Sequence, residues 1–227
     1  MSRNGLGSLV LLFIFWLITA ASAPIASAQG GGNPPTPGLE PAIHFAHLTS
    51  DDGLVQNSIE TILQDRQGFM WIGTPAGLSR YDGYHFTTYK HDPSDPNSLS
   101  HNWVRDLFED QEGMIWVATE GGGMNKFDPR TETFTRYLPD PKNPNSLAGD
   151  RVFTIFQDSA GNFWFVGGGL TGLNRFNPTT QTYTRYVSDP NNPASFQGSG
   201  VWDMLEDEAG NLWLAASTLL AKYNPQT

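Results

Sequence analysis

Short apolar segments separated by Gly, Pro and Asp recur along most of the chain. One stretch predicts four strands, at residues 103–109, 114–119, 124–127 and 134–137. Turn-forming residues separate these strands at 110–113, 121–123 and 128–133. Helices are disfavoured because Gly or Pro interrupts every segment longer than about eight residues. The pattern therefore predicts a small antiparallel sheet of four strands joined by tight turns.

This pattern occurs four times. Each copy has an Asp six residues before a Trp and a Gly three residues before it, in the sets Asp65, Gly68, Trp71; Asp110, Gly113, Trp116; Asp158, Gly161, Trp164; and Asp207, Gly210, Trp213. The tryptophans are 45, 48 and 49 residues apart. Four strands in each such period describe a propeller blade. We predict an all-β chain, a β-propeller of four-stranded antiparallel blades over residues 42–227.

The recurring residues have structural interpretations. We expect each Trp to wedge between neighbouring blades, where truncation to Ala typically costs ~3–5 kcal/mol; stacking on a sugar is the alternative for a single copy. Each Asp is assigned to a turn of its own blade, too far from the others to share one ion. The glycine runs 121–123 and 167–169 lack the Lys-Ser/Thr pair and the helix of a phosphate loop, so we interpret them as hairpin turns. We predict no metal site and no cofactor.

When the four copies are aligned on their Trp, two columns of equivalent positions hold different residues in each copy. Thirteen residues before the Trp stand Ser58, Trp103, Arg151 and Gly200, and eleven before it stand Glu60, Arg105, Phe153 and Trp202. Packing positions recur because packing recurs, whereas a binding site must differ between blades. We therefore predict a ligand site at the mouth of the central channel, with aromatics for stacking and arginines for hydrogen bonds, formed by Trp103, Arg105, Arg151 and Trp202. The alternative is that these residues serve inter-blade packing and surface charge.

Composition excludes several functions. Thirteen basic and twenty-three acidic residues give a net charge of −10, which argues against nucleic acid as a partner. The absence of Cys excludes disulfides, thiolate zinc sites and a Cys nucleophile. The five histidines lie in predicted strands or loops, and the chain has no ATP-binding segments. We therefore expect this chain not to be an enzyme.

The amino terminus resembles an export signal. Residues 1–28 contain Arg3, an apolar run over Leu9–Ile18 and two small-x-small cleavage sites. We favour cleavage after Ala28 over cleavage after Ala23. An uncleaved anchor is the alternative, although the apolar run is shorter than the ~20 residues of a membrane span. Residues 29–41 form a Gly/Pro linker that we expect to be disordered, and the mature chain is expected in the periplasm or outside the cell.

The repeat resembles the two-component regulator propeller repeat, on the pattern Asp-x-x-Gly-x-apolar-Trp-apolar-x-Thr followed by Gly-apolar-x-Arg-aromatic-Asp. The first copy carries it on Asp65, Gly68, Trp71, Thr74, Gly77, Arg80 and Asp82. The later copies depart from it at Gly167, Asn177, Ala216, Leu219 and Asn224. The resemblance implies an extracytoplasmic sensor for a small ligand, such as a glycan fragment, and a dimer in the full-length protein. It also implies a signal to a kinase or output domain of the parent protein, which is absent here.

Two alternatives to a sensor are a secreted propeller enzyme acting on polysaccharide and a protein-interaction platform. An enzyme would need a clustered acid/base set, which the channel columns do not supply. The fourth copy stops before a fourth strand, and residues 43–45 resemble an orphan fourth strand. We therefore expect an incomplete part of a larger propeller that exposes an open blade edge. A small ring of four blades is the alternative.

Overall fold

The computed structural model describes residues 44–143, 145–167, 172–189, 191–198 and 201–224. The predicted signal peptide and linker lie outside the described residues. The chain divides into an N-terminal unit, Met1–Phe45, and a repeat unit, Ala46–Thr227. All the strands below belong to the repeat unit.

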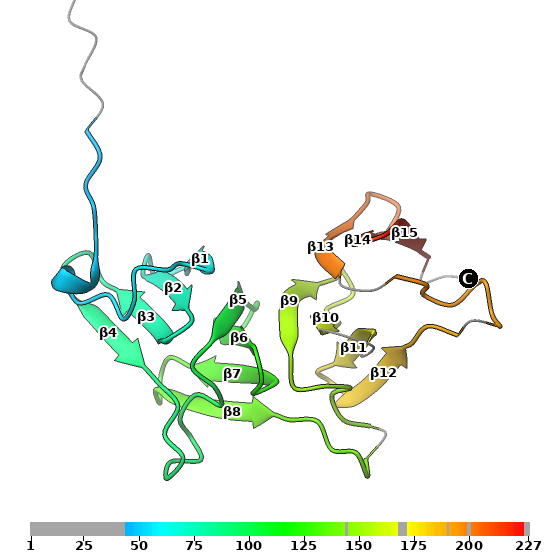
Figure 1. Ribbon diagram of the computed structural model, residues 1–227, viewed down its shortest axis with the longest axis horizontal. Helices are drawn as coiled ribbons and strands as arrows, with labels where there is room; N and C mark the ends of the chain where they lie inside the picture. The colour runs from blue at the N-terminus through cyan, green and yellow to red at the C-terminus, as the bar shows by residue number, and fades with distance from the viewer. Residues whose placement is uncertain (1–43, 144, 168–171, 190, 199–200, 225–227) are drawn as a thin grey trace, which may run out of the picture. The chain divides into compact units, whose positions relative to one another are not determined.

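The repeat unit contains four antiparallel sheets whose strands follow chain order (Figure 1). The first sheet contains β1 (Thr61–Gln64), β2 (Met70–Thr74), β3 (Gly77–Tyr81) and β4 (Phe86–Tyr89). The second contains β5 (Val104–Glu109), β6 (Ile115–Thr119), β7 (Met124–Asp128) and β8 (Thr133–Tyr137). The third contains β9 (Val152–Gln157), β10 (Phe163–Gly167), β11 (Leu173–Asn177) and β12 (Thr182–Tyr186). The fourth contains β13 (Val201–Glu206), β14 (Leu212–Ala216) and β15 (Leu220–Tyr223).

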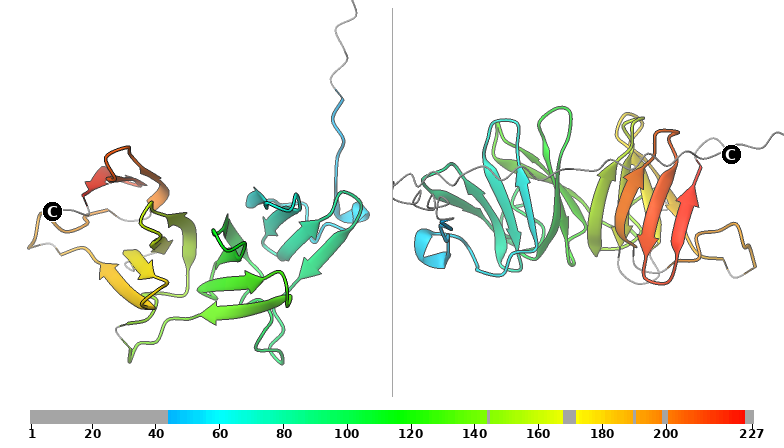
Figure 2. Two further views of the ribbon diagram at one scale, coloured as in Figure 1. Left: turned by 180° about the vertical axis from the view of Figure 1, so that it is seen from behind. Right: turned by 90° about the horizontal axis from the view of Figure 1, so that it is seen from above.

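The strands agree with the sequence pattern, and the all-β prediction is confirmed. In the second sheet each observed boundary lies within one residue of the predicted one. The hairpins that join the strands of the first and second sheets can be followed in Figure 2. Gly113 has φ 81° and Gly123 has φ 63°, a left-handed conformation that Gly adopts without steric cost. A single short 3₁₀ helix, η1 (Ser50–Asp52), precedes the first sheet among the described residues.

One strand prediction is wrong for the residues that can be assessed. The orphan strand expected at 43–45 is absent at His44 and Phe45, which lie in no strand, while residue 43 is outside the described residues. Both side chains are exposed. Pro41 lies two residues upstream, and four of the five residues at 46–50 are polar or small, so this segment has no long apolar alternation.

The tryptophan of each of the first three sheets lies against the next sheet. Trp71 is fully buried and contacts the Phe127 ring of the second sheet at 5.3 Å between centroids. Trp116 contacts Phe163 of the third sheet at 4.5 Å. Trp164 contacts Tyr223 of the fourth sheet at 5.3 Å. The core is therefore divided into layers between successive sheets, each centred on one indole.

The first strands of successive sheets are neighbours: β1 lies beside β5, β5 beside β9 and β9 beside β13. Asp106 of β5 links its own strand to β1 and β9. Its carboxylate accepts hydrogen bonds from Thr61 Oγ1 of β1 at 3.4 Å and from the Ile155 N–H of β9 at 2.9 Å. Side chains near the start of these strands are thus brought together from different repeats, and the predicted ligand residues all stand there.

Candidate functional site

Three of the four predicted ligand residues come together. Trp103 directly precedes β5, Arg105 lies in β5, and Arg151 directly precedes β9. Arg151 also pairs with Glu120 in an isolated β-bridge, which brings the end of the β6 hairpin to the start of β9. We refer to Glu60, Trp103, Arg105, Glu120 and Arg151 as the inner-strand cluster.

Two carboxylates organise the inner-strand cluster. Glu60 accepts hydrogen bonds from the Trp103 indole N–H at 3.2 Å and from Arg105 Nη1 at 3.1 Å. Glu120 forms ion pairs with Arg105 Nε at 3.5 Å and with Arg151 Nε at 3.0 Å. The Glu60 pair joins the first and second sheets, and the Arg151 pair joins the second and third. The cluster therefore links neighbouring sheets, in agreement with the packing alternative. The same contacts hold its side chains in fixed positions.

Aromatic rings flank the Arg105 guanidinium. Its carbon atom lies 5.6 Å from the centre of the Trp103 ring and 5.0 Å from that of Phe153. Guanidinium groups in this position are attracted by the ring electrons. Arg105 is thus held by two carboxylates and two rings, so that its remaining N–H groups have a fixed direction before any ligand arrives.

Solvent reaches the inner-strand cluster unevenly. The side chains of Arg105 and Glu120 are 23% and 12% exposed, whereas that of Arg151 is 58% exposed. Trp103 is 37% exposed. The cluster therefore combines a partly buried charged centre with one accessible guanidinium and one accessible indole. Two acidic and two basic groups leave it without net charge, which suits a polar, uncharged ligand.

The hydrogen bonds of Trp202 go to residues outside this cluster. It is 62% exposed, and its indole N–H donates to Ser217 Oγ at 3.1 Å. The backbone carbonyl of Trp202 accepts from Thr154 Oγ1 of the third sheet at 3.4 Å. Trp202 therefore presents an accessible aromatic face at the first strand of the fourth sheet, while the other three predicted residues gather at the second and third sheets.

Two cluster residues were missed in the sequence. Glu60 stands in the same column as Arg105, and opposite charges in one column of adjacent repeats predict an ion pair between neighbouring inner strands. Glu120 stands four residues after its Trp, as does Ser217 in the fourth copy. Glu120 forms an ion pair with Arg105 and Ser217 accepts a hydrogen bond from Trp202, so each contacts an inner-strand side chain of its own sheet. The position four residues after the Trp differs between copies, and this variation could have identified Glu120 from the sequence.

Among the residues that the structure describes, no group of His, Asp and Glu side chains could hold a metal ion. In the same part of the chain, no helix has the length and apolar character of a membrane span.

Comparison with known proteins supports the repeat assignment. The family model "Two component regulator propeller" matches residues 53–76, 98–121 and 146–169, which are equivalent parts of the first three copies. The chain carries two-component regulator propeller repeats. A histidine kinase of Formosa agariphila is 43% identical over 56 residues, which is 25% of this chain and 4% of the kinase.

Solved structures place the regulator propeller repeats in the β-propeller fold. The extracellular domain of a proposed hybrid two-component system from B. thetaiotaomicron superposes with a TM-score of 0.64 at 24% identity, over 79% of this chain and 30% of that one. The WD40 β-propeller domain of Doa1 superposes with a TM-score of 0.54 at 12% identity, over 74% of this chain and 52% of that one. At these identities the likeness concerns the fold. The chain spans under a third of the length of the extracellular domain.

Proposed function

We propose that this chain is the extracytoplasmic, ligand-sensing propeller of a two-component signal transduction protein, which passes a binding signal to a kinase or output module outside these residues. The regulator propeller repeats and their likeness to the extracellular domain of a two-component system support this role. The observation that carries the proposal is the inner-strand cluster, where columns that differ between repeats bring Trp103, Arg105 and Arg151 together.

The ligand class that fits the inner-strand cluster is a glycan fragment. Sugar rings stack on exposed aromatic faces, and their hydroxyl groups pair with fixed donors and acceptors. Trp103 supplies such a face, and Arg151 supplies donors at its accessible end. Trp202 extends the aromatic surface toward the fourth sheet. Because the cluster is neutral, a neutral or weakly charged oligosaccharide should be preferred over a polyanion.

Binding is favoured over catalysis by the partners of the two carboxylates. Glycoside hydrolysis needs one carboxyl group that donates a proton and a second that acts as base or nucleophile. Glu60 accepts a hydrogen bond from Arg105 and Glu120 forms an ion pair with it, so both carboxylates are engaged with one guanidinium. A polysaccharide-degrading enzyme therefore remains the second proposal, and it would need a different acid from the one this cluster offers.

The test is calorimetric titration of the folded chain with a panel of neutral oligosaccharides. Arg105→Ala and Arg151→Ala should each weaken binding of an oligosaccharide that binds the wild type by at least tenfold, since each removes a charge-assisted donor. Arg130→Ala is the matched control, because Arg130 is an exposed arginine that pairs with Asp128 in its own turn. Unchanged binding in both cluster variants would refute the site.

A further inference from the structure

The strand β5 has an irregularity near its start. Val104 pairs with Thr119 of β6 and Asp106 pairs with Ala118, so Arg105 is an extra residue that has no opposite residue in β6. Such a β-bulge interrupts the ladder and bends the strand, and it changes the direction in which the side chain of the extra residue points. Bulges are frequent beside active sites because they re-aim side chains in this way.

The same bulge occurs in the first strands of the third and fourth sheets. In β9 the residues on either side of Phe153 pair with consecutive residues of β10, so Phe153 is the extra residue. In β13 the same relation to β14 makes Trp202 the extra residue. We refer to Arg105, Phe153 and Trp202 as the bulge residues. All three stand eleven residues before the Trp of their copy, so the bulge coincides with one of the two columns that differ between repeats.

Phe153 lies outside the apolar layers between the described sheets, and it was not among the predicted ligand residues. Val152 and Ile155 of the same strand are buried in the layer between the second and third sheets, whereas Phe153 is partly exposed and takes no part in that layer. The centre of its ring lies 5.0 Å from the guanidinium carbon of Arg105. The bulge therefore places an accessible aromatic ring directly beside the inner-strand cluster.

Trp202 continues the row of bulge residues on the next first strand. The strand β13 lies beside β9, and the Thr154 hydroxyl group donates to the Trp202 carbonyl oxygen at 3.4 Å. Because the Trp202 indole N–H donates to Ser217, its ring face is what Trp202 offers to a ligand. The bulge residues thus change from a guanidinium at the second sheet to aromatic rings at the third and fourth sheets.

This order of side chains fits an elongated sugar chain. A sugar ring has hydroxyl groups at its rim and C–H groups on its faces, so one unit can hydrogen-bond to arginines while the next stacks on an aromatic ring. A single sugar in the inner-strand cluster has little need of Phe153. A second unit that follows the row from β5 toward β13 meets the Phe153 ring first and the Trp202 ring after it.

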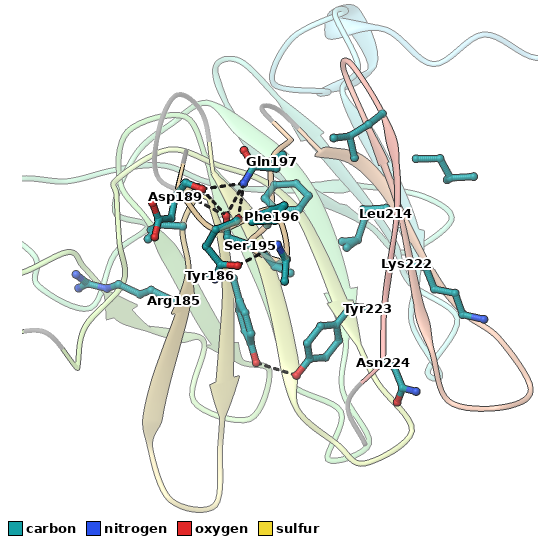
Figure 3. A pocket seen from close by; sticks show the side chains of 18 residues that line it. Arg185, Tyr186, Asp189, Ser195, Phe196, Gln197, Leu214, Lys222, Tyr223 and Asn224 are labelled. Atoms are coloured by element: carbon teal, nitrogen blue, oxygen red, sulfur yellow. Dashed lines mark hydrogen bonds between the residues drawn. The ribbon is translucent and has the colours of Figure 1, made fainter. Parts of the chain in front are cut away.

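A separate cavity of about 930 Å³ is bounded by β15 and by the loop at residues 189–197 (Figure 3). Lys222 lines this cavity, whereas Phe153 and Trp202 do not. The Lys222 ammonium group also lies 5.0 Å from the centre of the Trp213 ring. The Trp213 indole therefore reports on a ligand that enters the cavity, and the Trp202 indole reports on one that follows the bulge residues.

We propose that Phe153 is a specificity-determining residue that stacks on the second unit of an elongated neutral oligosaccharide. The first unit of this ligand occupies the inner-strand cluster, and the third reaches Trp202. This inference rests on the proposed function and adds to it that the site selects its ligand by chain length.

The test is calorimetric titration of the full chain with β-linked oligosaccharides of glucose, xylose, mannose and galactose, each from the single sugar to the hexamer. For a series that binds, affinity should rise about tenfold or more from the single sugar to the trimer, because two aromatic rings are added. Phe153→Leu removes the aromatic face and keeps an apolar side chain. It should lower the ratio of trimer affinity to single-sugar affinity about fivefold. Phe153→Tyr keeps the ring and should keep the ratio.

The affinity ratio separates stacking from an indirect effect of Phe153 on Arg105, which would weaken all lengths alike. Tyr84→Leu is the matched control, since Tyr84 is an 85% exposed aromatic in the turn between β3 and β4, at the opposite end of the first sheet from Glu60. It should leave the ratio unchanged. Equal wild-type affinities for all lengths, or an unchanged ratio in Phe153→Leu, would overturn this inference and leave the proposed function standing. Absence of binding throughout the panel would overturn both.

The indole resonances of the ¹⁵N-labelled wild-type chain locate the added units without any substitution. The single sugar should shift the Trp103 indole, and the trimer should shift the indoles of Trp103 and Trp202. A shift of Trp213 in place of Trp202 would put the added units in the cavity beside β15 and would overturn the inference. Because this measurement needs no variant, it decides the question even if Phe153→Leu folds poorly.

Discussion

The indole N–H of Trp116 donates a 2.8 Å hydrogen bond to Oδ2 of Asp110, six residues earlier in the chain. The same bond joins the Asp and the Trp of the other three copies, at 2.8, 2.8 and 2.9 Å. Oδ1 of Asp110 accepts from the N–H groups of Glu112 and Met114 in the turn, both at 2.9 Å. One carboxylate therefore holds the hairpin turn and orients the indole that packs against the next sheet.

We predict that Asp110→Ala lowers the free energy of unfolding by about 3 kcal/mol, because it leaves a buried indole N–H and two turn N–H groups without their acceptor. Urea denaturation measures the change. Glu112→Ala is the matched control, since Glu112 lies in the same turn with a 78% exposed side chain. It should change stability by less than about 0.5 kcal/mol. Equal effects of the two substitutions would contradict the double role of Asp110.

The tryptophans should differ in their energetic importance. Trp116→Ala should cost ~3–5 kcal/mol, because it removes a 1% exposed side chain from the layer between two sheets. Trp213→Ala should cost clearly less, because Trp213 is only partly buried. Thermal unfolding of the two variants compares them directly. A larger loss for Trp213 would show that the fourth sheet is packed in a way that its described contacts do not account for.

Ionised Asp207 should stabilise the fourth sheet, and this stabilisation should be lost in strongly acidic solution. The hydrogen bond from Trp213, followed by that from the Asn211 backbone, holds the pKa of Asp207 well below its ordinary value of 3.8. A lowered pKa in the folded state means that the contribution is complete above pH 3.8 and is lost as the pH falls toward the folded value. The Trp213 indole resonance should report this loss. Asp207→Asn should remove the pH dependence, and an unchanged profile in this variant would contradict the assignment.

Asp106 should have the opposite pH dependence. Burial, with a smaller effect from Asp203, raises the pKa of Asp106 above 3.8 despite its hydrogen bonds to Ile155, Leu107 and Thr61. A raised pKa means that its contribution is complete below pH 3.8 and is lost as the pH rises through the folded value. Relative to Asp106→Asn, the wild type should therefore lose stability as the pH rises above 3.8, measured by urea denaturation at each pH. A gain in relative stability over this rise in pH would contradict the effect of burial.

Local patterns in the sequence predicted most of the architecture. The spacing of Asp110, Gly113 and Trp116 marks a turn and a buried strand, because both are determined within one repeat. Contacts between repeats were harder to predict. The pairing of Glu60 with Arg105 depends on how two inner strands lie beside each other. Trp103, Arg105 and Arg151 could be selected from the sequence because they lie in columns that differ between repeats, and their use as a ligand site stays a prediction.

The central claim is that ligands bind at the varying inner-strand positions and not at the repeated framework. It is tested most directly by titrating the ¹⁵N-labelled chain with a binding oligosaccharide and following the indole resonances of its seven tryptophans. The account predicts that the Trp103 indole shifts with saturation while those of Trp71, Trp116 and Trp164 stay in place. Shifts of the three framework indoles without a shift of Trp103 would contradict it.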